Sequence, residues 1–308
     1  VHPGYGFLAE NADFAEAVIA AGMVWIGPPP DAIRAMGDKG AAKRVARQAG
    51  VPLIPGYDGD DQSDATLGAE AAKIGWPVMI KAAMGGGGRG MRRVERAEDF
   101  AAALASARRE SKSAFADDRV ILEKAIDGAR HVEVQVFGDA QGNVVHLGER
   151  DCSVQRRNQK VLEEAPAPGA TPELRAAMGA ASEKLARAVG YVNAGTVEFL
   201  LAPGGTFYFL EMNTRIQVEH PVTEMVTGLN LIRLQFDIAM GRPLSFDLDG
   251  VTLSGHAIEA RLCAEDPDDG FKPQTGTLTL EGIPRNVRVD WAGTPDVTGD
   301  YDSMLAKV

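Results

Sequence analysis

The sequence predicts an α/β fold made of two or three packed subdomains. The first 130 residues alternate helical and strand-like segments, and from His131 onward most segments are strand-like around one long helix. The chain has 308 residues, of which 45% are hydrophobic, so it can build more than one core.

Composition narrows the class of protein. The net charge of −11 opposes a nucleic-acid partner, because an acidic surface repels phosphates. No apolar run reaches the roughly 20 residues that span a bilayer, so no membrane partner is expected. Cys152 and Cys263 are too far apart for a local metal motif, which favours a reducing compartment. We therefore expect a soluble protein that is cytoplasmic, in a bacterium, or otherwise intracellular.

The first elements have clear boundaries. Asn11 can cap a helix that Gly22 ends, and the apolar run Val24–Ile26 predicts a short strand before Gly27 and three prolines. Asp38 can cap a second helix that extends through Ala49.

The next unit alternates again, and the last part of the chain contains one clear helix. The predicted elements are a helix ending at Ile74, strand Val78–Ala82, strand Met91–Val94, helix Ala97–Ser113, strand Val120–Glu123 and helix Pro172–Val189. Both ends of the chain are expected to be cut, because a strand or turn should already be under way at Val1 and Val308 ends an apolar stretch.

A glycine-rich loop separates two of these strands. Gly85, Gly86, Gly87 and Gly88 are consecutive and Gly90 follows, so backbone N–H groups there are free to wrap an anion. Lys81 ends the preceding strand, where a buried lysine needs an anion. The loop suits a flap over nucleotide phosphates, and a mobile surface hairpin is an equally good interpretation.

A hairpin is predicted to bring two acids together. Thr196–Leu201 and Phe207–Asn213 flank Gly204-Gly205, and a two-residue turn there places Glu198 opposite Glu211. Facing carboxylates repel each other, and a bridging Mg²⁺ removes that cost. A slipped register, or two side chains in water, would remove the argument.

Polar residues then continue at every second position. Glu211, Asn213, Arg215, Gln217 and Glu219 point to one side if the chain is extended. An arginine between amides suits a small planar anion, and a carboxylate beyond it suits a general base. A solvated sheet face would show the same alternation.

Three weaker patterns complete the candidates. Residues 148–160 are rich in charges and amides, which fits a solvated loop or an anion-lined cleft. His131, Glu133 and Gln135 alternate along one strand. Arg261 lies in an apolar run and needs a partner, and no nucleophile with a base and an orienting group is evident.

Several long segments carry a resemblance to a known family. The sequence resembles the biotin carboxylase component of biotin-dependent carboxylases, an ATP-grasp fold, over essentially its whole length. The resembling segments are 2–8, 36–39, the glycine loop, 149–153, 155–157, 159–160, 163–166 and 211–221.

The resemblance implies a domain organisation. Residues 1–37 would be the remnant of an N-terminal doubly wound subdomain, and 38–53 a linker helix. Residues 54–126 would be the lid subdomain with the glycine loop, and 127–308 the C-terminal ATP-grasp subdomain running into an incomplete C-terminal region.

The resemblance also implies residue roles. The implied ATP-binding residues are Lys39, Lys81, Gly85, Gly86, Gly87, Gly88, Gly90, Glu123, Lys124, Ile126, His131, Gln155 and Asn158. The implied metal ligands are Glu198, Glu211 and Asn213. The implied bicarbonate and biotin pocket consists of Lys160, Arg215, Gln217, Val218, Tyr5, Gly6 and Arg261. Glu219 would deprotonate bicarbonate, and Arg261 would stabilise the biotin enolate.

The implied activity is ATP- and bicarbonate-dependent carboxylation of biotin, in an acyl-CoA carboxylase α subunit. The implied cofactors are ATP and two Mg²⁺ or Mn²⁺ ions, with biotin as a carrier-bound substrate. The implied partners are a biotin carboxyl carrier domain or protein, a carboxyltransferase subunit and a second copy of the chain. Asn158 departs from the histidine of many members, and Ala202-Pro203 adds a residue before the hairpin turn. A ligase of the carbamoyl-phosphate synthetase type and a catalytically incomplete nucleotide-binding module remain as alternatives.

Overall fold

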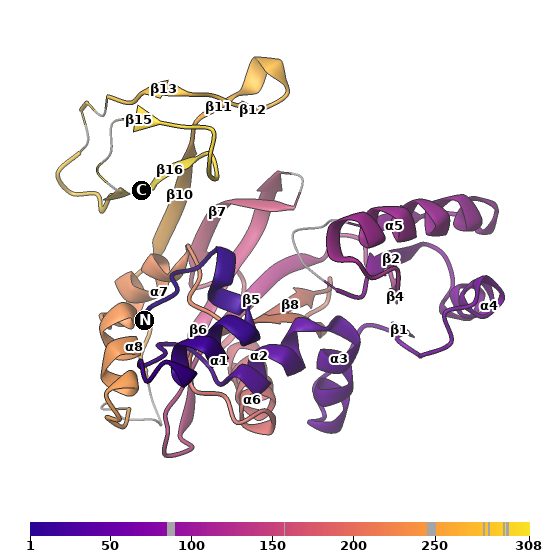
Figure 1. Ribbon diagram of the computed structural model, residues 1–308, viewed down its shortest axis with the longest axis horizontal. Coiled ribbons are helices and arrows are strands. Elements are labelled where there is room, and N and C mark those ends of the chain that lie inside the picture. The colour runs from indigo at the N-terminus through magenta and orange to yellow at the C-terminus, as the bar shows by residue number, and fades with distance from the viewer. Residues whose placement is uncertain are drawn as a thin grey trace.

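A computed structural model of the protein describes residues 1–84, 90–156, 158–244, 251–279, 281–282, 284–291, 293 and 296–308. Two main sheets organise these residues, and Figure 1 shows them side by side with helices packed on each. None of the helices in this part of the chain is long and apolar enough to cross a membrane.

The smaller sheet has four antiparallel strands in the order β1-β4-β2-β3. Its elements are β1 (Gly56–Tyr57), α4 (Asp64–Ile74), β2 (Val78–Ala82), β3 (Arg92–Val94), α5 (Phe100–Phe115) and β4 (Val120–Lys124). Leu67 and Leu104 from the helices pack on Ile80 and Leu122 from the strands, which gives this unit its own core. It stands apart from the rest in Figure 1, to the right of the larger sheet.

The larger sheet has eight strands in the order β14-β16-β10-β7-β6-β5-β8-β9. Their bounds are β5 (Arg130–Gly138), β6 (Val144–Arg156), β7 (Gln159–Ala165), β8 (Asn193–Leu201), β9 (Phe207–Asn213), β10 (Ala257–Cys263), β14 (Asp290–Trp291) and β16 (Met304–Lys307). Short strands β11 (Glu265–Asp266), β12 (Lys272–Pro273), β13 (Gly276–Thr277) and β15 (Asp296–Val297) form two small pairs beside it.

Helices cover this sheet. The N-terminal helices are α1 (Ala12–Ala20), α2 (Pro30–Gly37) and α3 (Lys39–Gln48), and the later ones are α6 (Pro172–Ala188), α7 (His220–Thr227) and α8 (Leu231–Ala239). Helices α2, α3 and α6 share one core with β5, β8 and β9, whereas α8 packs on β5, β6 and β8 in a second core. The 3₁₀ turns η1 (Phe7–Glu10), η2 (Ala97–Asp99) and η3 (Pro267–Asp269) complete the elements.

Side-chain caps explain where several helices begin. The Phe14 N–H donates to Asn11 Oδ1 at 2.8 Å, and the Ala41 N–H donates to Asp38 Oδ1 at 2.7 Å, which confirms both predicted caps. Thr171 and Asn230 cap α6 and α8 in the same way. Because Asn230 precedes a run with buried Leu231, Leu234 and Ile238, α8 was recognisable in the sequence, but neither α7 nor α8 was predicted.

One predicted strand is wrong. Val24–Ile26 has no strand partner beyond Val1, whose carbonyl accepts from the Ile26 N–H at 2.9 Å. A single residue is too short to form a ladder, so this segment is irregular. The helix predicted before β4 also begins with a separate 3₁₀ turn, η2.

The hairpin of β8 and β9 brings Glu198 opposite Glu211, as predicted, but by a different route. Its turn is wider than two glycines, because the Ala202 N–H donates to Thr206 O at 2.8 Å and the innermost pair is Leu201 with Phe207. A bulge between Glu198 and Phe199 then shifts the register by one residue. The wider turn and the bulge each shift the pairing by one residue, in opposite directions. Glu198 therefore still lies opposite Glu211.

Candidate active site

A cavity of about 1080 Å³ lies over strands β5 to β9 and reaches the smaller sheet and the N-terminal segment. Most site residues predicted from the sequence line it: Tyr5, Gly6, Lys39, Lys81, His131, Gln155, Asn158, Lys160, Glu198, Glu211, Asn213, Arg215, Gln217, Val218, Glu219 and Arg261. Gly90, Glu123, Lys124 and Ile126 do not line it. Gly85, Gly86, Gly87 and Gly88 lie outside the described residues.

The two facing acids each contact a lysine. Lys39 Nζ donates to Glu211 Oε2 at 2.9 Å, and Lys160 Nζ donates to Glu198 Oε1 at 2.9 Å. Asn213 Nδ2 also donates to Glu198 Oε1, at 2.8 Å. Burial alone would raise the pKa of Glu198, but Lys160 and His131 hold it well below its usual range. The Glu198 carboxylate is therefore available as an anion.

This donor set fits a divalent cation. Glu198 and Glu211 are cross-strand partners on the side that lines the cavity, and Asn213 adds an amide oxygen two residues further along β9. Carboxylate and amide oxygens are the ligands that Mg²⁺ takes in nucleotide sites. The ammonium groups of Lys39 and Lys160 now balance a negative charge that a metal ion would balance instead.

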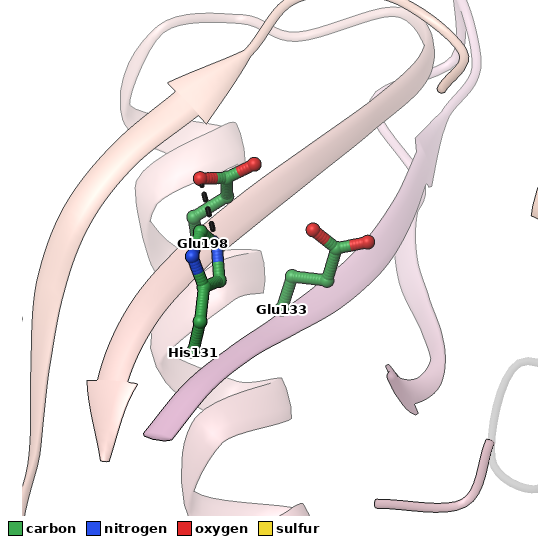
Figure 2. A group of neighbouring side chains, drawn as sticks. All are labelled: His131, Glu133 and Glu198. Atoms are coloured by element: carbon green, nitrogen blue, oxygen red, sulfur yellow. Dashed lines mark ion pairs between the residues drawn. The ribbon is translucent and has the colours of Figure 1, made fainter. Parts of the chain in front are cut away.

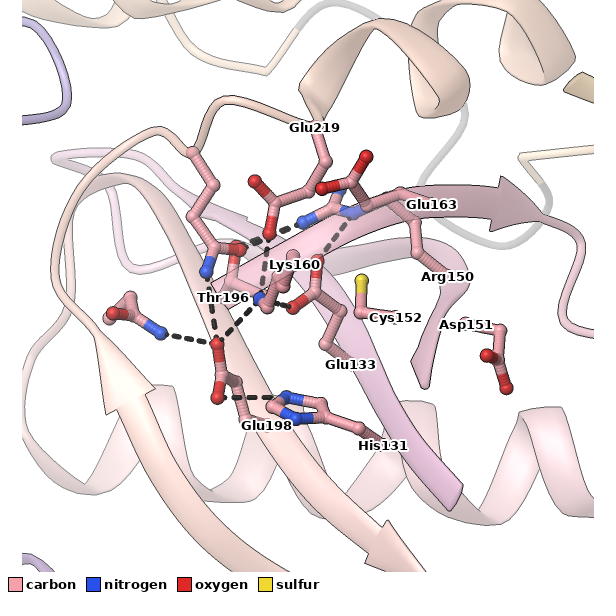
Figure 3. A network of polar contacts seen from close by, with 12 residues as sticks. His131, Glu133, Arg150, Asp151, Cys152, Lys160, Glu163, Thr196, Glu198 and Glu219 are labelled. Carbon is pink, nitrogen blue, oxygen red and sulfur yellow. Dashed lines mark hydrogen bonds and ion pairs between the residues drawn. The ribbon is translucent and has the colours of Figure 1, made fainter. Parts of the chain in front are cut away.

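Lys160 is the centre of the charge cluster in Figure 3. Its ammonium group donates to Glu133, to Glu198 at 2.9 Å and to Glu219 at 2.7 Å. Burial would lower the pKa of Lys160, but the three carboxylates raise it well above its usual range. Lys160 therefore stays charged beside three carboxylates. A further anion that binds here must compete with these carboxylates for the ammonium group.

Glu219 lies between two cations. Arg261 Nη2 donates to Glu219 Oε2 at 3.0 Å, while Lys160 takes the other oxygen. Burial would raise the pKa of Glu219, but Lys160, Arg261 and Arg150 hold it well below its usual range. Arg261 also donates through Nε to Glu163 Oε1 at 2.7 Å, so it has the partner that the sequence required.

Arg215 is oriented from the N-terminal part of the chain. Its Nε donates to Glu10 Oε2 at 2.9 Å, and its Nη2 donates to Asn213 Oδ1 at 3.1 Å. Glu10 also accepts from the Thr214 N–H at 2.9 Å. The guanidinium group is therefore held at the wall of the cavity by two residues of different segments.

His131, Glu133 and Glu198 form a second group of possible metal ligands, shown in Figure 2. His131 Nε2 lies 2.9 Å from Glu198 Oε2, and its Nδ1 lies 2.9 Å from Gln155 Nε2. Burial would lower the pKa of His131, but Glu198 raises it above its usual value, which favours the charged, non-ligating form. Lys160 also contacts both carboxylates, so hydrogen bonding rather than metal ligation explains this group.

Lys81, on β2, meets its anion inside the smaller sheet. Its ammonium group contacts Glu123, whose other oxygen lies 2.5 Å from Lys43 Nζ. Burial would raise the pKa of Glu123, but the two lysines lower it to about 2. The Glu123 carboxylate is therefore committed to two lysines.

The extended row predicted after the hairpin is partly wrong. Strand β9 ends at Asn213, and residues 214–219 are irregular, with a bend at 214–215 and a turn at 218–219. Arg215, Gln217 and Glu219 nevertheless all line the cavity. The chain turns toward α7 there, so their common orientation comes from the bend rather than from a strand pleat.

Sequence reasoning did not assign four residues that hold the site: Glu10, Glu133, Arg150 and Glu163. Glu133 and Arg150 form a fully buried ion pair at 2.7 Å between β5 and β6. The alternation of His131, Glu133 and Gln135 and the polar run 148–160 were signals for this pair. No sequence signal links Glu10 to Arg215, because they are 205 positions apart.

The chain matches three family models. Residues 38–246 match "Carbamoyl-phosphate synthase L chain, ATP binding domain". Residues 1–33 match the biotin carboxylase N-terminal domain, and residues 259–308 match the biotin carboxylase C-terminal domain. Arg261 lies in the last of these matches.

Similar curated proteins are longer. The chain is 52% identical over 313 aligned residues to the mitochondrial methylcrotonoyl-CoA carboxylase subunit alpha of Dictyostelium discoideum, covering all of this chain and 45% of that protein. It is 53% identical to the chloroplastic biotin carboxylase 1 of Populus trichocarpa, covering 59% of that protein. The chain thus spans about half the length of these relatives.

Solved structures share the fold. The biotin carboxylase domain dimer of the Hydrogenobacter thermophilus 2-oxoglutarate carboxylase, in complex with MgADP, ADP and bicarbonate, superposes with a TM-score of 0.95 at 46% identity. That match covers 99% of this chain and 68% of the other. A Campylobacter jejuni biotin carboxylase complex with β-γ-ATP gives 0.94 at 45% identity, with 99% and 69% covered. The chain therefore belongs to the biotin carboxylase family and has its ATP-grasp fold.

Proposed function

We propose that the protein containing this chain uses ATP and bicarbonate to carboxylate biotin on a carrier domain or protein, as the first half-reaction of a biotin-dependent acyl-CoA carboxylase. The observation that carries this proposal is the position of Glu219, a buried carboxylate held between Lys160 and Arg261 at the wall of the main cavity. Such an arrangement suits an acid–base group that works on an anionic substrate.

Bicarbonate would bind beside Arg215, Gln217, Val218 and Lys160. Glu219 would take its proton, and a bicarbonate oxygen would attack the γ-phosphorus of ATP and release ADP. The resulting carboxyphosphate would break into CO₂ and phosphate. Biotin would give its ring N–H proton to that phosphate and attack CO₂, while Arg261 stabilises the enolate oxygen near Tyr5 and Gly6.

The basicity of Glu219 would depend on its neighbours. With Lys160 and Arg261 both in contact, the carboxylate is too strongly stabilised to be an effective base. An incoming anion competes for the same two cations. As they turn toward bicarbonate or phosphate, the pKa of Glu219 rises toward the operating pH, which makes the base active only when substrate is present.

Mg²⁺ would be held by Glu198, Glu211 and Asn213, and when bound it would offset the negative charge of the ATP phosphates. We propose two ions, of Mg²⁺ or Mn²⁺, because two carboxylates and three phosphates share one region. Lys39, Lys81, His131, Gln155 and Asn158 would bind the nucleotide from the cavity wall. The backbone of Glu123, Lys124 and Ile126 would contact adenine, and the loop from Gly85 to Gly90 would cover the phosphates.

The partners follow from the reaction. A biotin carboxyl carrier domain or protein must deliver biotin to the cavity mouth, and a carboxyltransferase subunit must use the product. A homodimer or larger complex is proposed, supported by the dimer of the Hydrogenobacter thermophilus domain. A cytoplasmic or otherwise intracellular location stays a prediction, since the relatives above are named as mitochondrial and chloroplastic proteins.

One competing ligase activity has support from a family match. The ATP-binding domain model takes its name from carbamoyl-phosphate synthase, whose chemistry would also start from ATP and bicarbonate. The flanking matches favour biotin, because both carry biotin carboxylase names and the second contains Arg261. A nucleotide-binding module without activity is disfavoured because Lys160, Arg215 and Glu219 are all present at the cavity.

A steady-state ATPase assay on the complete polypeptide tests the proposal. We expect ADP release to require bicarbonate and Mg²⁺ and to increase with free biotin. Activity that requires ammonia or glutamine and ignores biotin would contradict it.

A further inference from the structure

Arg150, on β6, is among the largest side chains that are fully buried in the described part of the chain. A guanidinium group inside a protein is costly unless ion pairs and hydrogen bonds replace its water. Its position between β5 and β7 puts it beneath the cavity floor rather than in the cavity lining.

All five N–H donors of Arg150 have acceptors. Nε donates to Glu133 Oε1 at 2.7 Å. The two terminal nitrogens donate to four more side chains, which are Gln135 at 2.8 Å, Thr223 at 2.9 Å, Thr196 at 3.3 Å and Gln217 at 3.0 Å. Figure 3 shows Arg150, Glu133 and Thr196 close to Lys160. Only a planar fork with five donors can satisfy this set.

One of these bonds sets the orientation of Gln217. Its Oε1 accepts from Arg150, and its Nε2 donates to Glu198 Oε1 at 3.1 Å. The amide oxygen of Gln217 is therefore directed into the protein interior, toward Arg150. Its N–H₂ group is directed toward Glu198 in the cavity wall. Without Arg150, the Glu198 contact would remain to favour that orientation, but the amide oxygen would lose its donor.

A second bond acts on Lys160. Arg150 occupies Oε1 of Glu133, and Lys160 contacts Oε2 of the same carboxylate. Each oxygen of Glu133 thus contacts one cation. These two contacts fix the plane of the carboxylate and the position of the Lys160 ammonium group. Arg150 therefore influences two donors that line the cavity without touching it.

We propose that Arg150 is a positioning residue that presents the Gln217 amide N–H₂ and the Lys160 ammonium group to the substrate anion. This inference rests on the proposed function, because it takes bicarbonate as that anion. Arg150 is thereby linked to the binding of bicarbonate, the second reactant. It is not linked to the nucleotide, whose expected contacts lie nearer the smaller sheet.

The test is Arg150→Lys in the complete polypeptide, with Thr223→Val as the matched control. Lysine keeps the charge but cannot reach five acceptors, whereas Thr223→Val removes one Arg150 partner that does not line the cavity. We expect Arg150→Lys to raise the KM for bicarbonate about tenfold or more, with kcat at saturating bicarbonate and the Kd for ATP changed by less than about threefold. Thr223→Val should leave the KM for bicarbonate within about twofold.

A double-mutant cycle separates positioning from general damage. If Arg150 acts through Gln217, the effects of Arg150→Lys and Gln217→Ala on the KM for bicarbonate will not multiply in the double variant. Fully multiplicative effects, or an equal loss of ATP and bicarbonate binding in Arg150→Lys, would overturn the inference.

A second variant covers a failure of Arg150→Lys to fold. Arg150→Met combined with Glu133→Gln removes the buried ion pair as a unit, so no buried charge is left uncompensated. The KM for bicarbonate must rise there too while ATP binding persists, and an unchanged KM would overturn the inference. If the wild-type protein lacks bicarbonate-dependent ATP hydrolysis, the proposed function fails and the role of Arg150 fails with it. The wild-type assay alone gives that result, so it is distinct from a failure of the Arg150 role.

Discussion

Glu219 is the residue whose charge state decides the chemistry. It is 2% exposed, and its two oxygens contact Lys160 and Arg261. Since both contacts favour the carboxylate over the acid, Glu219 is ready to accept a proton once an anion draws the cations away. A glutamine of the same shape keeps hydrogen-bonding atoms but cannot accept the proton.

We therefore predict that Glu219→Gln lowers bicarbonate-dependent ATP hydrolysis by about 10²-fold or more, the usual contribution of a positioned base. The Kd for ATP, measured by fluorescence titration, should stay within about threefold, because no nucleotide contact is lost. Turnover at the wild-type rate would remove Glu219 from the role of base.

A second pair of facing acids includes Glu163, the residue that accepts a hydrogen bond from Arg261. Glu163 on β7 and Glu259 on β10 are cross-strand partners, and both are buried. Within the described residues, neither oxygen of Glu259 has a hydrogen-bond partner. Burial raises the pKa of Glu163 to about 7 and that of Glu259 to about 8, with Lys307 and Arg261 opposing the shifts.

This pair predicts a loss of stability with rising pH. Since these folded-state pKa values exceed the ordinary value of 4.5, the folded state holds more protons than the unfolded chain between pH 4.5 and about 8. Stability should fall as pH rises through that window, with each group contributing a slope of at most about 1.4 kcal/mol per pH unit. The free energy of unfolding, measured with urea from pH 5 to 9, should decline less steeply in Glu259→Gln than in the wild type. Identical slopes in the two proteins would contradict a raised pKa of Glu259.

At the scale of elements, the β8–β9 hairpin carries the metal argument. It places Glu198 and Glu211 opposite each other, each beside a lysine. We predict that Glu211→Gln raises the Mg²⁺ concentration for half-maximal ATP hydrolysis by about tenfold or more, because one anionic ligand is lost.

A surface acid is the control for that titration. Glu70→Gln on α4 removes a carboxylate that pairs with Lys73 and does not line the cavity, so its Mg²⁺ dependence should match the wild type. If Glu211→Gln also titrates like the wild type, the facing acids do not bind the metal.

The hairpin also shows what sequence could and could not predict. Alternation and the two glycines identified both strands and the facing acids, because these depend on local pattern. The wider turn and the bulge were not predictable, since they depend on how β9 packs against the rest of the sheet. Helix α7 was missed because its start follows directly from the irregular segment that holds Arg215 and Glu219.

The buried networks were less predictable still. Arg150 is satisfied by residues from two strands, a helix and a loop, between 15 and 73 positions away. Polar patterns marked Glu133 and the segment around Arg150 as unusual, but only the folded sheet shows that they meet. The family resemblance supplied the assigned roles, and the cavity gathers most of those residues.

At the scale of the molecule, Glu10 links the N-terminal segment to Arg215 at the site. Glu10, in η1, accepts from Arg215 Nε at 2.9 Å and from the Thr214 N–H at 2.9 Å. Figure 1 shows this segment beside the large sheet rather than within it. The orientation of Arg215 therefore depends on how residues 1–37 dock.

We predict that Glu10→Gln raises the KM for bicarbonate by about threefold to tenfold, since a charged hydrogen bond to Arg215 is replaced by a neutral one. ATP binding should be unaffected. Glu16→Gln is the control, because Glu16 pairs with Arg34 away from the cavity. Equal KM values in both variants would show that the N-terminal segment does not orient Arg215.

The most direct test of the account follows an oxygen atom. If a bicarbonate oxygen attacks the γ-phosphorus, that oxygen stays on phosphorus when carboxyphosphate loses CO₂. The account predicts that ¹⁸O from labelled bicarbonate appears in the phosphate released by the complete polypeptide, and that Glu219→Gln suppresses this transfer. Phosphate that gains oxygen only from water would contradict it.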